Sequence, residues 1–190
     1  IYDAAHAFGV KKRGRSILND GDLSVVSFHA TKVFNTFEGG AIISNSIEMK
    51  QKIDTLKNFG LKDESVLEIG GLNGKMSEVQ AAMGLLQLKY VDVTIEKRKR
   101  LALRYNRGLK DISGLKMFSQ DDDVAANYSY YPIFINGSCK RTRDEVQRLL
   151  AAEKITARKY FYPPLSENSH NKAYGQVVGL DVTEAEKLSR

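Results

Sequence analysis

The sequence predicts an α/β fold with a mostly parallel sheet, followed by a smaller α+β unit. Short runs of β-branched residues alternate with segments of helical periodicity, an arrangement typical of β–α–β units. Of the 190 residues, 42% are hydrophobic and 27% are charged, a composition that favours a buried core over disorder. We expect residues 1–93 to form the sheet-containing part and residues 94–190 the smaller unit.

The first half is expected to supply three strands, a helix and a glycine-rich loop. The helix is predicted over about 47–59, because Gly60 is a suitable residue to end it. The loop is predicted over 61–75, where glycines would allow unusual backbone angles: Gly70, Gly71 and Gly74. The predicted strands are 1–3, 24–28 and 41–44.

A capping box opens the next predicted helix, because the side chains of Ser77 and Gln80 can satisfy each other's backbone N–H groups. The β-branched residues within 90–95 indicate a break, after which the helical pattern resumes and stops at Gly108. The apolar face of the first of these helices has the spacing i, i+3, i+4 and i+7: Val79, Ala82, Met83 and Leu86.

The smaller unit is predicted to contain a strand over 128–135 and an extended segment over 155–162. Two further capping boxes would open helices, Thr142 with Glu145 and Thr183 with Glu186. The first residue is Ile1, and the last helical pattern stops soon after it starts. We therefore expect both ends to lie inside a longer protein.

Composition excludes several classes of protein. No apolar run approaches the roughly 18 residues that span a bilayer, and no signal-like segment is present, so a cytoplasmic protein without a membrane partner is expected. Cys139 is the only cysteine, which excludes an intramolecular disulfide and a cysteine-based metal site. We predict no bound metal.

The net charge of +6 comes largely from one basic run at helical spacing. It indicates a solvated helix face, a patch that attracts anionic substrates, or a nucleic-acid-binding module. No nucleic-acid motif or aromatic platform accompanies the run, so we predict no nucleic-acid partner. Its residues are Lys97, Arg98, Lys99, Arg100, Arg104 and Arg107.

Polar residues crowd the loop after the strand 24–28, the place where open α/β sheets bind ligands. Asp3 occupies a similar place at the end of another strand, and His6 follows three residues later. From the residues alone, a surface lysine and a turn serine remain open alternatives for Lys32 and Ser27. The candidate residues of this loop are Ser27, His29, Thr31 and Lys32.

Several segments resemble the DegT/DnrJ/EryC1/StrS family of sugar aminotransferases, which are fold-type I pyridoxal-phosphate enzymes. The resemblance covers nearly the whole chain in order and spacing, and it implies part of the large domain followed by an incomplete small C-terminal domain. The chain would lack the family's N-terminal part and extreme C-terminus. The matching segments are IYDAAHAFGV at 1–10, GDLSVVSFHATKVFNTFEGGAI at 21–42 and GLNGKMSEVQAAMGL at 71–85, with weaker matches YYPIFI at 130–135 and RKYFYPPL at 158–165.

The resemblance implies pyridoxal 5'-phosphate as the cofactor and suggests a role for each site residue. Lys32 would form the Schiff base with the cofactor aldehyde and later move a proton. Asp3 would pair with the pyridine nitrogen, and His6 would lie near the ring. Ser27 would donate to the phosphate, which Asn73 would reach from the neighbouring subunit. A surface Asp3, a packed His6 and a loop role for Asn73 are the alternatives.

The resemblance also implies a reaction. A homodimer with a shared active site would transfer an amino group, usually from glutamate, to a keto-deoxyhexose on a nucleotide diphosphate, here dTDP. Such a product would serve O-antigen or other polysaccharide biosynthesis. Some relatives carry His in place of Lys32 and dehydrate, so Lys32 indicates amino transfer. A non-catalytic sensor or binding module is the alternative.

The family's phosphate-binding helix start and its ring-stacking aromatic residue have no counterpart in this sequence. We therefore expect the isolated chain to show little transaminase activity.

Overall fold

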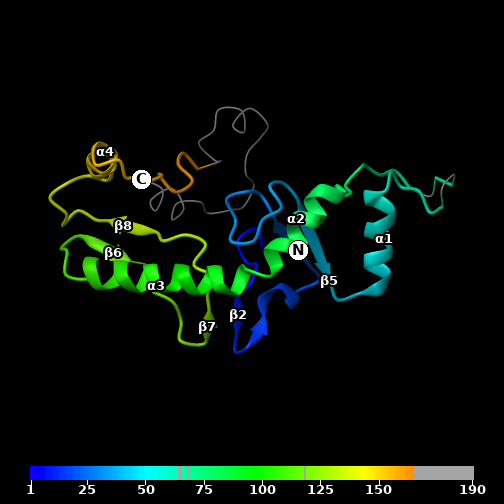
Figure 1. Cartoon of the computed structure of the whole chain (residues 1–190), viewed down its shortest axis with the longest axis horizontal. Helices are drawn as coiled ribbons and strands as arrows, with labels where there is room; N and C mark the ends of the chain where they lie inside the picture. Colours follow the sequence, from blue (N-terminus) through cyan, green and yellow to red (C-terminus); the bar gives the residue numbers. More distant parts are fainter. Residues whose placement is uncertain (64–65, 68, 118, 165–190) are drawn as a thin grey trace, which may run out of the picture. The chain divides into compact units, whose positions relative to one another are not determined.

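The computed structural model describes residues 1–63, 66–67, 69–117 and 119–164 (Figure 1). They fall into two units, one with residues 1–104 and 119–130, the other with the described residues from 105 to 117 and from 131 to 164. The predicted boundary at residues 93 and 94 lies within α3 and stays a prediction. In chain order the elements are β1 (Tyr2–Asp3), β2 (Lys11–Lys12), β3 (Arg15–Ser16), η1 (Ile17–Asn19), β4 (Leu23–Ser27), β5 (Gly40–Ser44), α1 (Ile47–Lys57), α2 (Glu78–Leu88), α3 (Val91–Leu109), β6 (Leu115–Met117), β7 (Val124–Ala125), β8 (Ile133–Ile135) and α4 (Arg143–Ala152).

β4 is the central strand of a three-stranded sheet in the first unit. β1 pairs with it in parallel and β5 in antiparallel orientation, and all three strands agree with the predicted segments to within a residue at each end. The connection 28–39 forms no helix. A parallel return normally needs a long crossover, usually helical, so this shorter connection brings β5 back antiparallel. The described sheet is therefore mixed, and not mostly parallel as predicted.

Alternation along β4 divides its side chains between two faces. Ser24 and Val26 are buried, with exposed fractions of 1% and 2%, whereas Val25 between them is 44% exposed. Asp3 pairs with Val25, and Ser27 lies two residues further along β4. Asp3, Val25 and Ser27 therefore share the exposed face of the sheet.

Three aromatic rings form the centre of the core on the other face. The rings of Phe28 and Phe34 meet edge to face with centroids 4.8 Å apart, and Phe8 stacks on Phe34 at 4.3 Å. Ala4 and Val26 complete this buried cluster. Phe28 and Phe34 lie on either side of the loop that carries Lys32, so the core fixes both ends of that loop.

The first helix after β5 begins and ends close to the predicted residues, and the second begins where it was predicted to. α1 begins after Ser46, whose hydroxyl accepts the N–H of Met49, and the chain leaves it through Gly60 at φ +78°. α2 begins with the predicted capping box of Ser77 and Gln80, which is confirmed. Its predicted apolar face is mostly exposed in this chain, and Gly84 is its buried residue.

The predicted cause of the glycine-rich loop was wrong. None of Gly70, Gly71 and Gly74 has a left-handed φ, which occurs at Gly60 instead. A Cβ at Gly71 would strike the backbone of Gly60 and the carbonyl oxygen of Leu56. Gly71 is therefore required by the close approach of two backbone segments.

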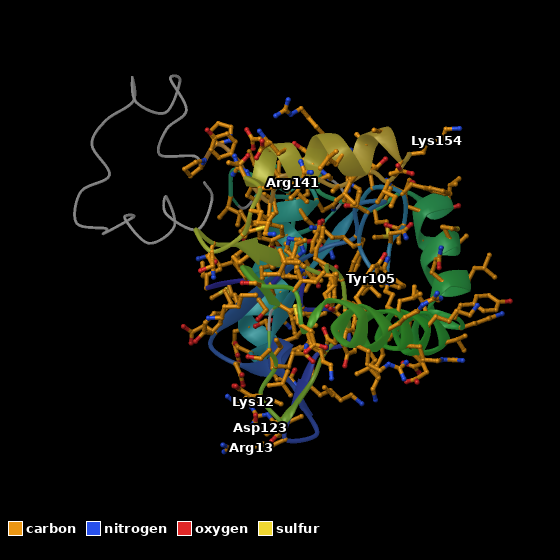
Figure 2. All side chains as sticks on the ribbon, turned by 90° about the vertical axis from the view of Figure 1, so that its left-hand side faces the viewer. Lys12, Arg13, Tyr105, Asp123, Arg141 and Lys154 are labelled. Atoms are coloured by element: carbon orange, nitrogen blue, oxygen red, sulfur yellow. The ribbon has the colours of Figure 1, made fainter. Side chains whose placement is uncertain are left out.

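A basic hairpin, which the sequence did not predict, completes the first unit. β2 pairs with β3 across a two-residue turn, Arg13–Gly14, in which both residues have positive φ, as a tight hairpin turn requires. β2 also pairs antiparallel with β7. Arg13 donates its Nε–H to Asp123 at 2.9 Å, and Figure 2 shows both side chains at the tip of this sheet.

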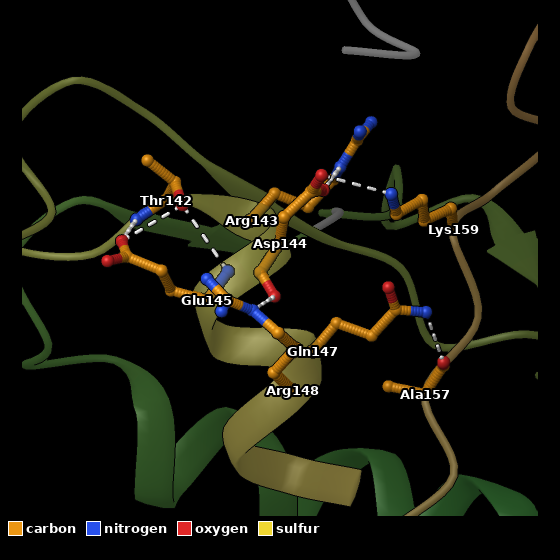
Figure 3. Close-up of polar contacts among 8 residues, drawn as sticks. All are labelled: Thr142, Arg143, Asp144, Glu145, Gln147, Arg148, Ala157 and Lys159. Atoms are coloured by element: carbon orange, nitrogen blue, oxygen red, sulfur yellow. Dashed lines mark hydrogen bonds and ion pairs between the residues drawn. The ribbon is translucent and has the colours of Figure 1, made fainter.

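The second unit contains the antiparallel pair β6 and β8 and the helix α4 (Figure 1). The predicted capping box of Thr142 and Glu145 is confirmed at the start of α4 (Figure 3). Asp144 in the first turn accepts hydrogen bonds from Arg143 and Lys159, and these two cations lower the pKa of its carboxyl group, Lys159 more strongly.

The predicted strand 128–135 is shorter than expected, because only Ile133–Ile135 joins a ladder. Tyr128 has φ +50°, outside the range of a strand. The predicted extended segment 155–162 is interrupted by a turn at Tyr160 and Phe161, where φ is +48° at Phe161. The helix predicted from Thr183 lies outside the described residues, among which no helix is long and apolar enough to cross a membrane.

Removal of the Phe34 ring should destabilise the protein and release the Lys32 loop. We expect Phe34→Ala to lower the free energy of unfolding by about 3–5 kcal/mol, the usual cost of a large buried cavity. Phe37→Ala is the matched control, since that ring is 54% exposed. Urea unfolding of the two variants gives the comparison. Equal losses for both would contradict the burial argument.

Candidate active site

Lys32 lies in the loop that connects β4 to β5, at the carboxyl end of β4. Its backbone N–H donates to the carbonyl oxygen of His29 at 2.9 Å. The loop closes where the N–H of Thr36 donates to the carbonyl oxygen of Phe28, also at 2.9 Å. Val33 and Phe34 are buried directly after Lys32. The backbone of Lys32 is thus held from both sides, while its side chain remains half-buried.

The amine of Lys32 meets a second residue of the candidate site. Its Nζ lies 3.3 Å from Nε2 of His6, which follows the carboxyl end of β1. Because a lysine ammonium group has only donors, it can hydrogen-bond there only to an imidazole nitrogen that carries a lone pair. With the lysine charged, the contact therefore needs a neutral imidazole at His6.

The surroundings of His6 favour this neutral form. Burial lowers the pKa of His6 most strongly, and the positive charge of Lys32 lowers it further. The carboxylate of Asp3 acts in the opposite direction with a smaller effect. Together these effects hold the pKa of His6 below the ordinary histidine value.

Asp3 and Ser27 stand at the carboxyl ends of neighbouring parallel strands and on one face of the sheet. An Oδ1 atom of Asp3 accepts the N–H of Ala5 at 3.0 Å. The hydroxyl of Ser27 accepts the N–H of His29 at 3.3 Å and keeps its own proton available for a ligand. Asp3 remains exposed, so its second oxygen can receive a donor.

His29 and Thr31 support the loop from outside. The Nδ1 atom of His29 lies 2.9 Å from the hydroxyl of Thr31, and its Nε2 lies 3.6 Å from a carboxylate oxygen of Glu38. These contacts run along the loop itself, so the structure gives His29 a local role.

Asn73 makes its contacts with residues other than the remaining candidates. It forms an isolated bridge with Asn58 beyond the end of α1. Within the described residues, no hydrogen bond joins it to Lys32, Asp3 or Ser27. An arrangement in which Asn73 serves the site of a second subunit remains a prediction.

Two glycines end the Lys32 loop and permit its close packing. A Cβ at Gly39 would lie 2.6 Å from Oγ1 of Thr36, and a Cβ at Gly40 would lie 2.7 Å from the carbonyl oxygen of Val26. Gly39 also has φ +146°, which other residues rarely adopt. Steric contacts therefore require glycine at both positions of the Glu-Gly-Gly sequence that ends the loop.

Sequence reasoning missed the residues that contact His6 and the residue that holds the segment next to them. Asn127 is 5% exposed and donates to the carbonyl oxygens of His6 and Phe8 at 2.7 and 2.9 Å. The ring of Tyr130 lies 4.9 Å from the ring of His6. Arg98 was grouped with a solvated basic face, yet it is half-buried and donates to the chain between Asn127 and Tyr130. No local sequence pattern connects these positions.

The donor set fits pyridoxal 5'-phosphate. A primary amine, a carboxylate and a hydroxyl are the groups that would serve its aldehyde, its ring nitrogen and its phosphate, respectively. Lys32, Asp3 and Ser27 provide them at the ends of two neighbouring strands. The sheet face that carries Asp3 and Ser27 is exposed, so a flat ligand can reach it.

Comparisons with known proteins identify relatives of this chain. The profile of the DegT/DnrJ/EryC1/StrS aminotransferase family matches residues 1–190. A curated relative from Shigella dysenteriae, dTDP-4-amino-4,6-dideoxy-D-glucose transaminase, is 49% identical over 189 residues, which are 100% of this chain and 51% of that protein. The chain therefore spans about half the length of this relative.

Solved structures agree with the sequence match. DesI, crystallised in the presence of its TDP-sugar product, superposes with a TM-score of 0.88 at 34% identity, covering 98% of this chain and 47% of that one. A proposed sugar aminotransferase from Streptococcus pneumoniae, Spr1654, superposes in its PLP form with a TM-score of 0.82 at 25% identity, covering 96% and 47%. These likenesses confirm the predicted fold class, a partial large domain of fold type I.

His6 should make the stability of the chain depend on pH. Its pKa is lowered in the folded state, so the unfolded state binds more protons below the ordinary histidine value. The free energy of unfolding should then fall as the pH drops through about 6.5 toward the lower folded value. His6→Gln should reduce this slope, while above about pH 7.5 the two proteins should show the same pH dependence. Urea unfolding across this pH range measures the free energy of unfolding of the wild type and of His6→Gln. The same pH dependence for both proteins over the whole range would contradict the burial of His6.

Proposed function

The chain belongs to the DegT/DnrJ/EryC1/StrS aminotransferase family, and from this premise we propose that the protein carrying it is a sugar aminotransferase. The acceptor is a keto-deoxyhexose on dTDP, with the nitrogen entering at C4, as the name of the Shigella relative suggests. The observation that carries the proposal is the Lys32 amine, held beside His6 next to the strand ends that bear Asp3 and Ser27. The sugar carbonyl becomes an amine, and the amino-acid donor becomes a keto acid.

Pyridoxal 5'-phosphate is the proposed cofactor, and the PLP and PMP forms of the Streptococcus relative support it. When bound, it supplies an aldehyde for an amine and a ring that accepts electrons from the reacting carbon. Lys32 is the proposed attachment residue, because its amine is half-buried in a loop that the core holds in place. Once released by the amino donor, the same amine can move the proton between carbons.

Asp3 and Ser27 have proposed roles that follow from their charge and position. A carboxylate beside a pyridine nitrogen favours the protonated ring, so Asp3 would keep the ring cationic. The Ser27 hydroxyl would donate to the phosphate, where several directed donors are needed. We place His6 beside the ring, because it already contacts the amine of Lys32.

Asn73 is the proposed contribution of a second subunit. Its contacts in one chain are made near the end of α1, away from the residues grouped around Lys32. A homodimer with two shared sites would give this exposed asparagine a ligand to bind. Glutamate as amino donor and a cytoplasmic location complete the proposal, and both rest on the sequence resemblance.

Covalent capture of the cofactor tests the role of Lys32. Mixing the 190-residue chain with pyridoxal 5'-phosphate and borohydride should label Lys32, because reduction makes the lysine–cofactor bond permanent. Peptide mass spectrometry locates the label. Lys32→Ala should abolish it, and Lys62→Ala, which removes an exposed lysine, should not. Equal labelling of the wild type and Lys32→Ala would reject Lys32 as the attachment site.

Amino transfer tests the substrate class. The full-length protein, given glutamate and a dTDP-linked 4-keto-6-deoxyhexose, should release 2-oxoglutarate and the 4-amino sugar in equal amounts, measured by chromatography. Lys32→Ala should lower kcat by at least about a thousandfold, since it removes both the attachment and the proton-transfer group. We expect the 190-residue chain alone to show little of this activity. A 3-amino product would reject the proposed position of the nitrogen.

A further inference from the structure

Two residues outside the Lys32 loop contact His6, and a third holds the chain segment between them. We refer to them as the His6 clamp: Arg98, Asn127 and Tyr130. All three lie in the first unit of the chain, although more than ninety positions separate each of them from His6. Asn127 and Tyr130 contact His6 directly, and Arg98 contacts the backbone of the two residues between them.

The pairing of β2 with β7 brings Asn127 to His6. Lys11 pairs with Ala125 and Lys12 with Val124, and Asn127 follows two residues after this ladder. The buried amide of Asn127 then uses both N–H groups, on the carbonyl oxygens of His6 and Phe8. Its own oxygen accepts the N–H of Ser129 at 3.0 Å. Both N–H groups and the oxygen of the Asn127 amide are thus used, and two of these bonds hold the backbone at His6 and Phe8.

Arg98 holds the other side of the same loop. Its Nη1 atom donates to the carbonyl oxygens of Tyr128 and Ser129 at 3.3 and 3.0 Å. These contacts stabilise a backbone in which Tyr128 has φ +50°. The chain then turns so that the ring of Tyr130 meets the ring of His6 at an interplanar angle of 54°.

We propose that the His6 clamp positions the His6 ring against the Lys32 amine and so sets the direction in which that amine meets the cofactor aldehyde. The inference rests on the proposed function and adds three positioning residues to it. Without the clamp, the His6 ring would gain freedom, and the 3.3 Å contact between Nε2 and Lys32 Nζ would be lost for part of the time. The reacting amine would then lose its orientation, which costs rate even when the chain remains folded.

Two readouts on the 190-residue chain test the clamp, and the first needs no cofactor. NMR titration reports the pKa of His6, which is one of three histidines and can be assigned with His6→Gln. Asn127→Ala and Tyr130→Leu should raise this pKa toward that of a solvated histidine, because the ring becomes more exposed and leaves Lys32. A residue that only stabilised the fold would not move this value in a chain that remains folded.

The second readout is the rate of borohydride-trapped labelling of Lys32 by pyridoxal 5'-phosphate. The same variants should slow it by about 10- to 100-fold, the usual effect of a misplaced reacting group. If Asn127→Ala fails to fold, Tyr130→Leu and Arg98→Ala decide the outcome, since both leave the buried amide in place.

Matched controls separate positioning from general loosening. Ser129→Ala removes a buried hydroxyl that has no hydrogen-bond partner among the described residues, on the same loop. Arg100→Ala removes an exposed cation two positions from Arg98 on the same helix. Both controls should leave the pKa and the labelling rate unchanged.

Each result has a separate meaning for the two proposals. Folded clamp variants with an unchanged His6 pKa and labelling rate would overturn the clamp, and so would controls that change as much as the clamp variants. If the full-length wild-type protein is not labelled at Lys32, the proposed function fails, while the titration without cofactor still decides whether the clamp holds His6.

Discussion

The position of the candidate site depends on the contact between Phe28 and Phe34. These rings meet edge to face in the core, and the five residues between them form the loop that carries Lys32. Phe28 also closes the loop through its carbonyl oxygen, which accepts the N–H of Thr36. An amine on a free loop would sample many directions. Here the burial of two neighbouring aromatic residues restricts the backbone at Lys32 before any ligand binds.

The second constraint comes from the short ladder between β2 and β7. Its two residue pairs join parts of the chain more than a hundred positions apart, and they bring the amide of Asn127 to the backbone of His6. Lys32 thus has a local support in the core and a distant support through His6. The residues of the basic run on α3 differ in their surroundings. Arg98 is used inside the first unit, whereas its neighbours Lys97 and Lys99 remain exposed.

Features that depend on neighbouring residues were predictable from the sequence. The capping boxes of Ser77 with Gln80 and of Thr142 with Glu145 occur as expected, because each box needs only residues three positions apart. The strands around Lys32 were located by their short runs of β-branched residues, and the family resemblance directed attention to Asp3, Ser27 and Lys32.

Tertiary structure decided what the local patterns could not. Asn127 donates to His6 across 121 positions, and nothing in the segment around Asn127 indicates that partner. Gly71 is required by the approach of Leu56 and Gly60, although its own backbone angle is ordinary. The sequence by itself determined the capping boxes, the strands beside Lys32 and the loop that carries the amine, because those depend on short-range sterics and hydrogen bonds. Which side chains surround that amine was decided by strand pairing between distant segments, because a buried amide can satisfy its donors only where the fold brings acceptors to it.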